Sequence, residues 1–236
     1  MDGIEKAASD IRKLNQTLYI PRHEYQPVDA LAFRHLDLNF YDRVRDALVA
    51  QGCIWLGDVE NVTLKGTAND FRTFIRMLVS EDRATCIGLF HPKPKFWIRL
   101  LLWILRVKVG RTIDCESELS TGGYWVTSNA MEAGKLNSPP GFDMKLFPVN
   151  TRHESVFAAH QQRLGEFLRA NPGTRATSMR TPAEALEMQH RMQTVKAAHR
   201  KAVGYVTEDE LKRMGADSRT AAKIKQAMNR SQDAAS

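Results

Sequence analysis

The sequence Arg111–Ser128, RTIDCESELSTGGYWVTS, carries the clearest fold signal in this chain of 236 residues. In its first half, polar and acidic residues alternate with mostly apolar ones. This alternation is typical of a β-strand, because successive side chains of a strand point to opposite faces of the sheet. Gly122-Gly123 then supplies a turn, and Tyr124–Ser128 returns with aromatic and β-branched residues. We therefore predict an antiparallel hairpin with three side chains facing a core: Ile113, Cys115 and Leu119.

Further strand signals surround this hairpin. Cys53–Leu64 is rich in β-branched and aromatic residues, while Phe71–Val79 and Ala84–His91 flank a short polar turn. Met144–Phe147 can add one short strand. A helix at Phe96–Val107 would lie between the two hairpins and cover one face of the sheet. The sequence thus predicts an α+β fold with an antiparallel sheet of about five strands covered by helices.

The part of the chain after residue 150 reads as helical. A threonine followed three residues later by glutamate is the capping-box pattern that opens a helix. This pattern occurs at Thr151 with Glu154, Thr181 with Glu184, and Thr207 with Glu210. We therefore expect an α+β core domain at 1–150, with a weakly ordered arm at 1–37, and a helical, basic C-terminal region at 151–236.

The longest predicted helix, about residues 182–203, has a narrow apolar seam at alternating spacings of three and four residues. Such a seam either packs onto the chain's own domain or docks a protein partner or a second copy. Its members are Ala185, Met188, Met192, Val195, His199 and Ala202.

The cysteines and the N-terminal sequence indicate in which cellular compartment the protein is expected. The three cysteines, Cys53, Cys86 and Cys115, form no CxxC pair, and His91 is the only nearby histidine at zinc-ligand spacing. The N-terminal sequence has early acids and no apolar stretch of the kind that secretory signals contain. We therefore expect buried, reduced thiols, no metal site, no cofactor and a cytoplasmic protein.

The segment Lys95–Val109, KFWIRLLLWILRVKV, is the most apolar part of the chain. Its uninterrupted apolar run is only Leu100–Leu105, far short of the ~20 residues needed to cross a bilayer. A helix of this kind is a core element, or it lies in a membrane interface or a partner groove. The contact residues for the last two possibilities would be Trp97, Arg99, Trp103 and Arg106.

The positive charge of the chain is concentrated near its C-terminus. The whole chain carries a formal charge of +7, of which residues 151–236 contribute +6. A basic face of this kind attracts an acidic protein, an anionic membrane or nucleic acid. The candidate contacts are Arg213, Arg219, Lys223 and Lys225. Because no aromatic residue follows Tyr205, base stacking is absent there, which disfavours nucleic acid.

The acidic residues of the hairpin are the one cluster that suggests chemistry. Asp114, Glu116 and Glu118 share a strand face, as metal-binding carboxylates often do, although the Glu-x-Lys of metal nucleases is absent. On an exposed strand face these acids would need only water or neighbouring arginines. His91, at a predicted strand end, is a candidate pocket residue.

These observations favour a non-enzymatic interaction module for a protein partner, a second copy of the chain or the inner face of a membrane. One alternative is an enzyme whose site over the sheet combines His91 with Asp114, Glu116 and Glu118. The other is a nucleic-acid-binding protein that uses its basic C-terminal helices. A small-molecule ligand is neither indicated nor excluded.

Overall fold

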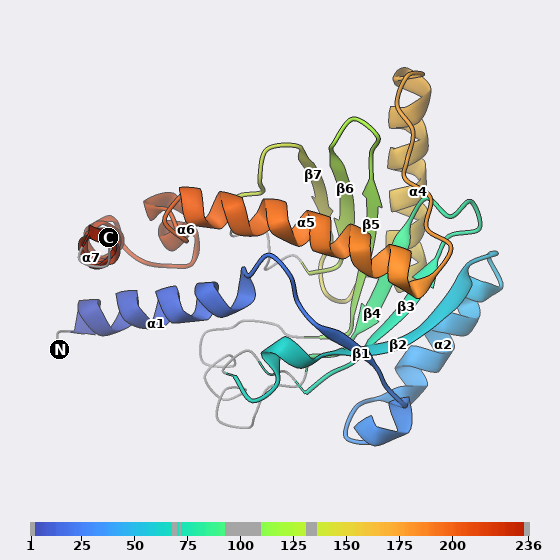
Figure 1. The fold of residues 1–236 in the computed structure, drawn as a ribbon, viewed down its shortest axis with the longest axis horizontal. Coiled ribbons are helices and arrows are strands. Elements are labelled where there is room, and N and C mark those ends of the chain that lie inside the picture. The colour runs from blue at the N-terminus through green and yellow to red at the C-terminus, as the bar shows by residue number, and fades with distance from the viewer. Residues whose placement is uncertain (1–2, 68–69, 71, 93–109, 131–135, 234–236) are drawn as a thin grey trace.

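The protein folds around a single mixed β-sheet (Figure 1). The structure is a computed structural model that describes residues 3–67, 70, 72–92, 110–130 and 136–233. In these ranges seven strands lie in sequence order across the sheet. They are β1 (Tyr25–Pro27), β2 (Ile54–Asn61), β3 (Ile75–Val79), β4 (Cys86–Phe90), β5 (Thr112–Glu118), β6 (Tyr124–Ser128) and β7 (Phe142–Leu146).

The α+β class is confirmed, but the predicted sheet of about five antiparallel strands is wrong in detail. β1 is a three-residue strand within the expected arm, and it pairs with the last part of β2. β7 runs parallel to β6, because the chain crosses back before pairing, whereas every other neighbouring pair is antiparallel. Short strands and crossover direction leave little trace in a local sequence pattern.

The predicted hairpin is confirmed. Glu118 pairs with Tyr124 and Asp114 with Ser128, so β5 and β6 are antiparallel around the glycine turn. Gly122 has a φ of 89°, a left-handed conformation that glycine adopts without strain. The side chains of Ile113, Cys115 and Leu119 are buried, as predicted.

Six helices accompany the sheet in the described ranges (Figure 1). The capping boxes at Thr181 and Thr207 are confirmed by reciprocal hydrogen bonds with Glu184 and Glu210. The box predicted at Thr151 is wrong, because Arg152 is the N-cap residue there and makes no capping hydrogen bond. The helices are α1 (Gly3–Leu18), α2 (Leu38–Val49), α4 (His153–Ala170), α5 (Pro182–Ala202), α6 (Glu208–Arg213) and α7 (Ser218–Asp233). Short 3₁₀ helices occur at Ala30–Phe33 and Val62–Leu64.

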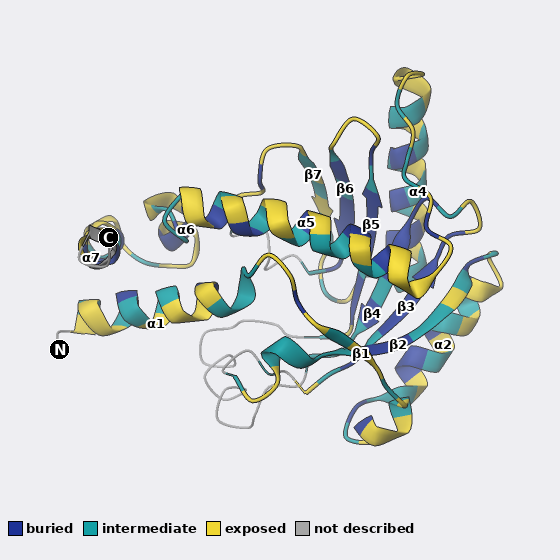
Figure 2. Cartoon of the chain, in the orientation of Figure 1, coloured by how far each residue is buried: buried dark blue, intermediate teal, exposed yellow. Residues whose placement is uncertain are grey.

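The buried residues, dark blue in Figure 2, include separate apolar clusters on the two faces of the sheet. α2 and α4 cover one face of the sheet, where Phe40, Leu78 and Ile113 are buried. α5 covers the other face through its buried Ala185, Met188 and Met192, so this half of the predicted seam packs onto its own sheet, whereas Val195 and Ala202 are exposed. The predicted covering helix, Phe96–Val107, lies outside the described residues. A third cluster joins α1, α6 and α7 through Ala8, Val206, Leu211, Ala221, Ile224, Ala227 and Met228.

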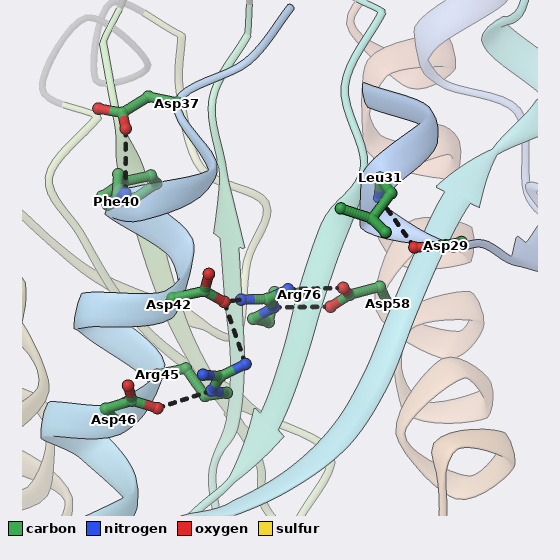
Figure 3. A network of polar contacts seen from close by, with 9 residues as sticks. All are labelled: Asp29, Leu31, Asp37, Phe40, Asp42, Arg45, Asp46, Asp58 and Arg76. Carbon is green, nitrogen blue, oxygen red and sulfur yellow. Dashed lines mark hydrogen bonds and ion pairs between the residues drawn. The ribbon is translucent and has the colours of Figure 1, made fainter. Parts of the chain in front are cut away.

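A buried arginine connects α2 to the sheet (Figure 3). Arg76 on β3 donates two hydrogen bonds of 2.8 Å to the carboxylate of Asp58 on β2. It donates a third, of 2.6 Å, to Asp42 on α2. Its guanidinium also lies 5.5–5.8 Å from the ring centroids of three aromatic residues, Tyr41, Trp55 and Phe74.

A buried histidine forms a second polar connection, between α4 and the sheet. His160 is fully buried, with Nε2 3.0 Å from Ser117 Oγ and Nδ1 3.0 Å from Thr127 Oγ1. Burial lowers the pKa of His160 to about 3, and the nearby charge of Arg163 acts in the same direction. The imidazole is therefore neutral in the native protein at ordinary pH.

This histidine should make the protein sensitive to mild acid. Below pH ~6.5 the unfolded chain binds a proton at His160 that the native state does not bind, so the free energy of unfolding falls as the pH falls. The loss is about 1.4 kcal/mol per pH unit at most, which integrates to about 2.3 kcal/mol between pH 6.5 and pH 4.5. Urea unfolding of the wild type and His160→Gln across this range measures it.

The glutamine variant loses the titration but keeps every other ionisable group. Its deficit relative to the wild type, caused by the lost buried hydrogen bonds, should therefore shrink as the pH falls. A deficit that stays constant from pH 8 to pH 4.5 would mean that His160 takes up its proton in the folded protein.

Candidate functional site

The acidic face of β5 lies under α5 and not in open solvent. Glu116 is buried, while Asp114 and Glu118 are partly buried. The interpretation of this face as an exposed strand surface is therefore wrong, although its acids do pair with a neighbouring arginine as that interpretation allowed. A covering helix that lies more than sixty residues later in the chain cannot be inferred from the strand's own alternation.

Two of the three carboxylates have basic or polar partners on α5. Arg191 donates two hydrogen bonds to Glu118, of 2.8 and 2.6 Å, and Tyr124 donates a third. Glu116 accepts a hydrogen bond from the side-chain amide of Gln189, and Lys196 Nζ lies 3.9 Å from its carboxylate. These contacts hold α5 across the sheet.

Asp114 differs from the other two acids, because no cationic side chain of the described residues forms an ion pair with it. Its direct neighbour on β4 is Gly88, which has no side chain to cover the carboxyl. Lys196 is close enough to influence its charge but lies nearer to Glu116. The Asp114 carboxyl is thus left facing a space between the sheet and the helix.

This space is a cavity of about 260 Å³ enclosed by α5 and by strands β1 to β5. Alternate residues of each strand face the helix side of the sheet, and most of those that line the cavity are apolar. A few polar groups converge on it, chiefly the carboxyls of Asp114 and Glu116 and the ammonium of Lys196. Representative apolar wall residues are Ile75, Met77, Phe90 and Leu186.

The cavity changes the acidity of Asp114. Burial raises the pKa of Asp114 to about 7, and the neighbouring charge of Glu116 acts in the same direction. The phenol of Tyr25, also in the wall, has its pKa raised by burial to about 12, so it remains a hydrogen-bond donor. Near neutral pH the site therefore contains a carboxyl that is only partly ionised.

Replacing Asp114 with asparagine should stabilise the protein at pH 8. The unfolded carboxyl ionises near pH ~3.9 and the native one near pH 7, so the native state loses stability as the pH rises between these values. Full linkage over that interval would be about 4 kcal/mol, but Asp114 is partly solvated, so we expect a gain of about 1–2 kcal/mol. Urea unfolding at pH 8 measures it.

Glu118→Gln is the matched control on the same strand face. Hydrogen bonds from Arg191 lower the pKa of Glu118, so its charge favours the folded state and its removal should cost up to about 1 kcal/mol. The two carboxyl-to-amide changes should thus have opposite signs at pH 8. A loss of stability in Asp114→Asn would show that the native protein favours the ionised carboxyl.

His91 does not join the carboxylates. Its backbone N–H donates to the Tyr41 hydroxyl at 2.8 Å, and its ring lies edge-on to Phe40, on the α2 side of the sheet. There it lines a second cavity, of about 540 Å³, together with Arg43, Arg111, Arg152 and His153. The structure thus places the proposed histidine and acids in different cavities.

The proposed surface contacts fall into three groups. Trp97, Arg99, Trp103 and Arg106 lie outside the described residues. Lys225 and Arg213 make contacts within the protein: Lys225 donates to the carbonyls of Val203 and Gly204, and Arg213 donates to Asn137. Arg219 and Lys223 are exposed. The basic helices thus use part of their charge in joining α7 and α6 to the rest of the chain.

Metal and membrane features were sought in the same ranges. No three His, Cys, Asp or Glu side chains of the described residues come together as a metal site requires. The three cysteines are free and buried, as predicted. None of the helices that the structure describes is long and apolar enough to span a bilayer.

The cavity wall contains residues that sequence reasoning missed, among them Tyr25, Gly88 and Lys196. The one local signal was Gly88, since a glycine inside a strand often marks a close approach or a space beside the sheet. Comparison of the chain with models of known protein families, with curated proteins and with solved structures found no match. The cavity under α5 is therefore the feature of the protein that points to a function.

Proposed function

We propose that the protein is a cytoplasmic, non-enzymatic binding module that holds a small, largely apolar molecule in the cavity under α5. The observation that carries this proposal is the cavity: an apolar wall of sheet and helix with a few convergent polar groups. Small-molecule sites commonly have this composition, and a carboxyl with a perturbed pKa adds to the case. The polar groups would orient the ligand, and the apolar wall would supply most of its affinity.

The enzyme alternative has less support from the geometry. It needs His91 beside the acids, and these residues line different cavities. Glu118 is occupied by Arg191, which leaves Asp114 and Glu116 without the histidine that the alternative assigned to them. A carboxyl that titrates near pH 7 could still transfer protons, so any activity would depend on Asp114.

The binding proposal can be tested by titrating ¹⁵N-labelled full-length protein with 1-hexanol. Amide shifts should move in β3, β4, β5 and α5 and not in α1 or α7. Leu186→Trp would fill the cavity from the α5 wall and should abolish these shifts. Val195→Trp is the matched control, since Val195 is an exposed residue on the same helix and is not part of the cavity wall.

Two results would overturn the binding proposal. One is the absence of saturable shifts around the cavity with 1-hexanol. The other is an equal response in Leu186→Trp and the wild type, which would place binding elsewhere.

A second candidate function is contact with an anionic membrane, and the basic cavity beside α2 favours it. Arg43, Arg111 and Arg152 line that cavity with His91 and Gly110. Clustered arginines attract the anionic headgroups of a bilayer. The basic C-terminal surface, with Arg219 and Lys223, would add to the attraction or receive an acidic protein partner.

Sedimentation with phosphatidylglycerol vesicles tests this candidate. We expect co-sedimentation at low salt, its loss at high salt, and none with phosphatidylcholine vesicles. Arg43→Gln/Arg152→Gln should weaken binding, whereas Arg169→Gln/Arg175→Gln, an equal charge change at exposed positions outside the cavity, should weaken it less. Equal effects of the two double variants would remove the role of the basic cavity.

A further inference from the structure

We infer that the ligand of the cavity under α5 is a cationic amphiphile: a small apolar molecule with an ammonium group that pairs with Asp114. This inference rests on the proposed binding function and specifies the chemistry of the ligand. It is argued from the charges that the cavity contains, from the position of Asp114 and from the shape of the wall beside it.

The charges of the cavity do not balance. Of the described residues that line it, two are carboxylates that face the cavity, Asp114 and Glu116, and one is a cationic side chain, Lys196. Arg191, one turn before on α5, is held by both oxygens of Glu118 and is therefore not available to the other acids. With both carboxylates ionised, the described part of the cavity wall carries a net charge of −1.

Lys196 stands on the Glu116 side of this pair, 3.9 Å from that carboxylate. Glu116 also accepts a hydrogen bond from Gln189, so its charge is compensated from two positions on α5. In the structure, no cationic side chain of the described residues forms an equivalent ion pair with Asp114. Asp114 is thus the carboxyl group at which a positive charge from a ligand would be accommodated.

The space beside Asp114 is suited to receive that charge. Gly88 lies directly opposite Asp114 on β4, so no side chain of that strand stands between the carboxyl and the cavity. Phe90 and Ile75 form apolar wall on the neighbouring positions. A ligand could therefore place a charged end at Asp114 and an apolar body along β3 and β4.

Electrostatics favours a cation over a neutral or an anionic ligand at this position. An ammonium within contact distance of a partly desolvated carboxylate is favourable, whereas a ligand carboxylate would add a third negative charge to the cavity. The groups around Asp114 are Glu116 on β5, Cys86 and Gly88 on β4, Lys196 on α5, and Ser128 on β6, whose side chain forms a hydrogen bond with the Asp114 carboxyl. A bound cation would keep Asp114 ionised at pH values where the empty site takes up a proton.

Three probes with one apolar chain separate these possibilities: hexylammonium, 1-hexanol and hexanoate. Dissociation constants are measured with the full-length chain at about pH 8.5, where Asp114 is ionised and a primary amine, like the side chain of lysine, is still protonated. We expect hexylammonium to bind at least ~10-fold more tightly than 1-hexanol and hexanoate to bind most weakly. In Asp114→Asn, hexylammonium should bind no more tightly than 1-hexanol binds to the same variant.

Glu118→Gln is the control, because it removes a carboxylate of the same strand face that does not line the cavity. It should keep the wild-type order of the three probes. Equal or tighter binding of 1-hexanol or hexanoate by the wild type, or an unchanged preference in Asp114→Asn, would overturn the inference but not the binding function. If none of the three probes binds, both are overturned.

Discussion

Replacing Arg76 with methionine is expected to lower the free energy of unfolding by about 3–5 kcal/mol, because it leaves the buried carboxylate of Asp58 without its partner. Arg76 and Asp58 are both 5% exposed in their side chains, and the pair is joined by two hydrogen bonds of 2.8 Å. Methionine keeps the apolar length of the side chain but supplies no donor. Urea unfolding followed by circular dichroism measures the loss.

Arg45→Met provides a control that shares one partner with Arg76. Arg45 forms ion pairs with Asp42 and Asp46, whose side chains are 50% and 67% exposed, and it also lies over the Trp55 ring. Exposed ion pairs contribute little, so this change should cost less than about 1 kcal/mol. Similar losses in the two variants would show that the carboxylate of Asp58 is not a buried charge in the native protein.

The sequence could predict features that depend on neighbouring residues, but not contacts between elements far apart in the chain. The hairpin at Thr112–Ser128 was predictable because strand alternation and a glycine turn are local properties of consecutive residues. The helix starts at Thr181 and Thr207 were predictable for the same reason, since a capping box involves residues three positions apart. At Thr151 the same motif did not cap α4, because the first turn begins one residue later.

Most of the candidate site was not predictable, because its walls come from six elements far apart in the chain. The spacing of Asp114, Glu116 and Glu118 correctly placed them on one strand face. It did not show that α5 would cover the face, or that Arg191 would form an ion pair with Glu118 while Asp114 forms none with the described residues. Chemical differences between three similar carboxylates arise here from tertiary contacts alone.

The basic C-terminal region gives a further example. Lys225 was a candidate surface contact, yet its ammonium donates to two carbonyls at the end of α5, where the helix dipole favours a positive charge. Sequence showed the charge, but only the fold shows that it is used to dock α7 against α5. Net charge is therefore a weak guide to a binding surface unless the internal partners of each residue are known.

The second large effect is expected at the buried ion pair between Arg200 and Glu210. Their side chains are 3% and 0% exposed, and Arg200 donates to Glu210 at 2.8 Å. Glu210 also accepts from the backbone N–H groups of Thr207 and Asn137, at 2.7 and 2.6 Å. The Glu210 carboxylate thus caps α6, holds the loop before β7 and neutralises the charge of Arg200 near the end of α5.

A double-mutant cycle separates the charge pairing from these other roles. Glu210→Gln keeps an acceptor for the backbone but leaves Arg200 as a buried, unpaired charge, and Arg200→Met leaves Glu210 unpaired; each should cost about 3–5 kcal/mol. In the double variant neither charge remains, so its cost should be at least about 2 kcal/mol smaller than the sum of the single losses. Urea unfolding of the four proteins gives this coupling energy.

The cycle also tests how α5 is held over the cavity. Lys196 lies one turn before Arg200 on this helix, and it approaches Glu116 only while the end of α5 stays in place. If α5 depends on the buried pair, amide protons near its C-terminal end should exchange faster with solvent in Arg200→Met than in the double variant. Additive losses in the cycle, with equal exchange in the two proteins, would mean that apolar packing alone positions the helix, and that Lys196 keeps its place beside Glu116 without help from the ion pair.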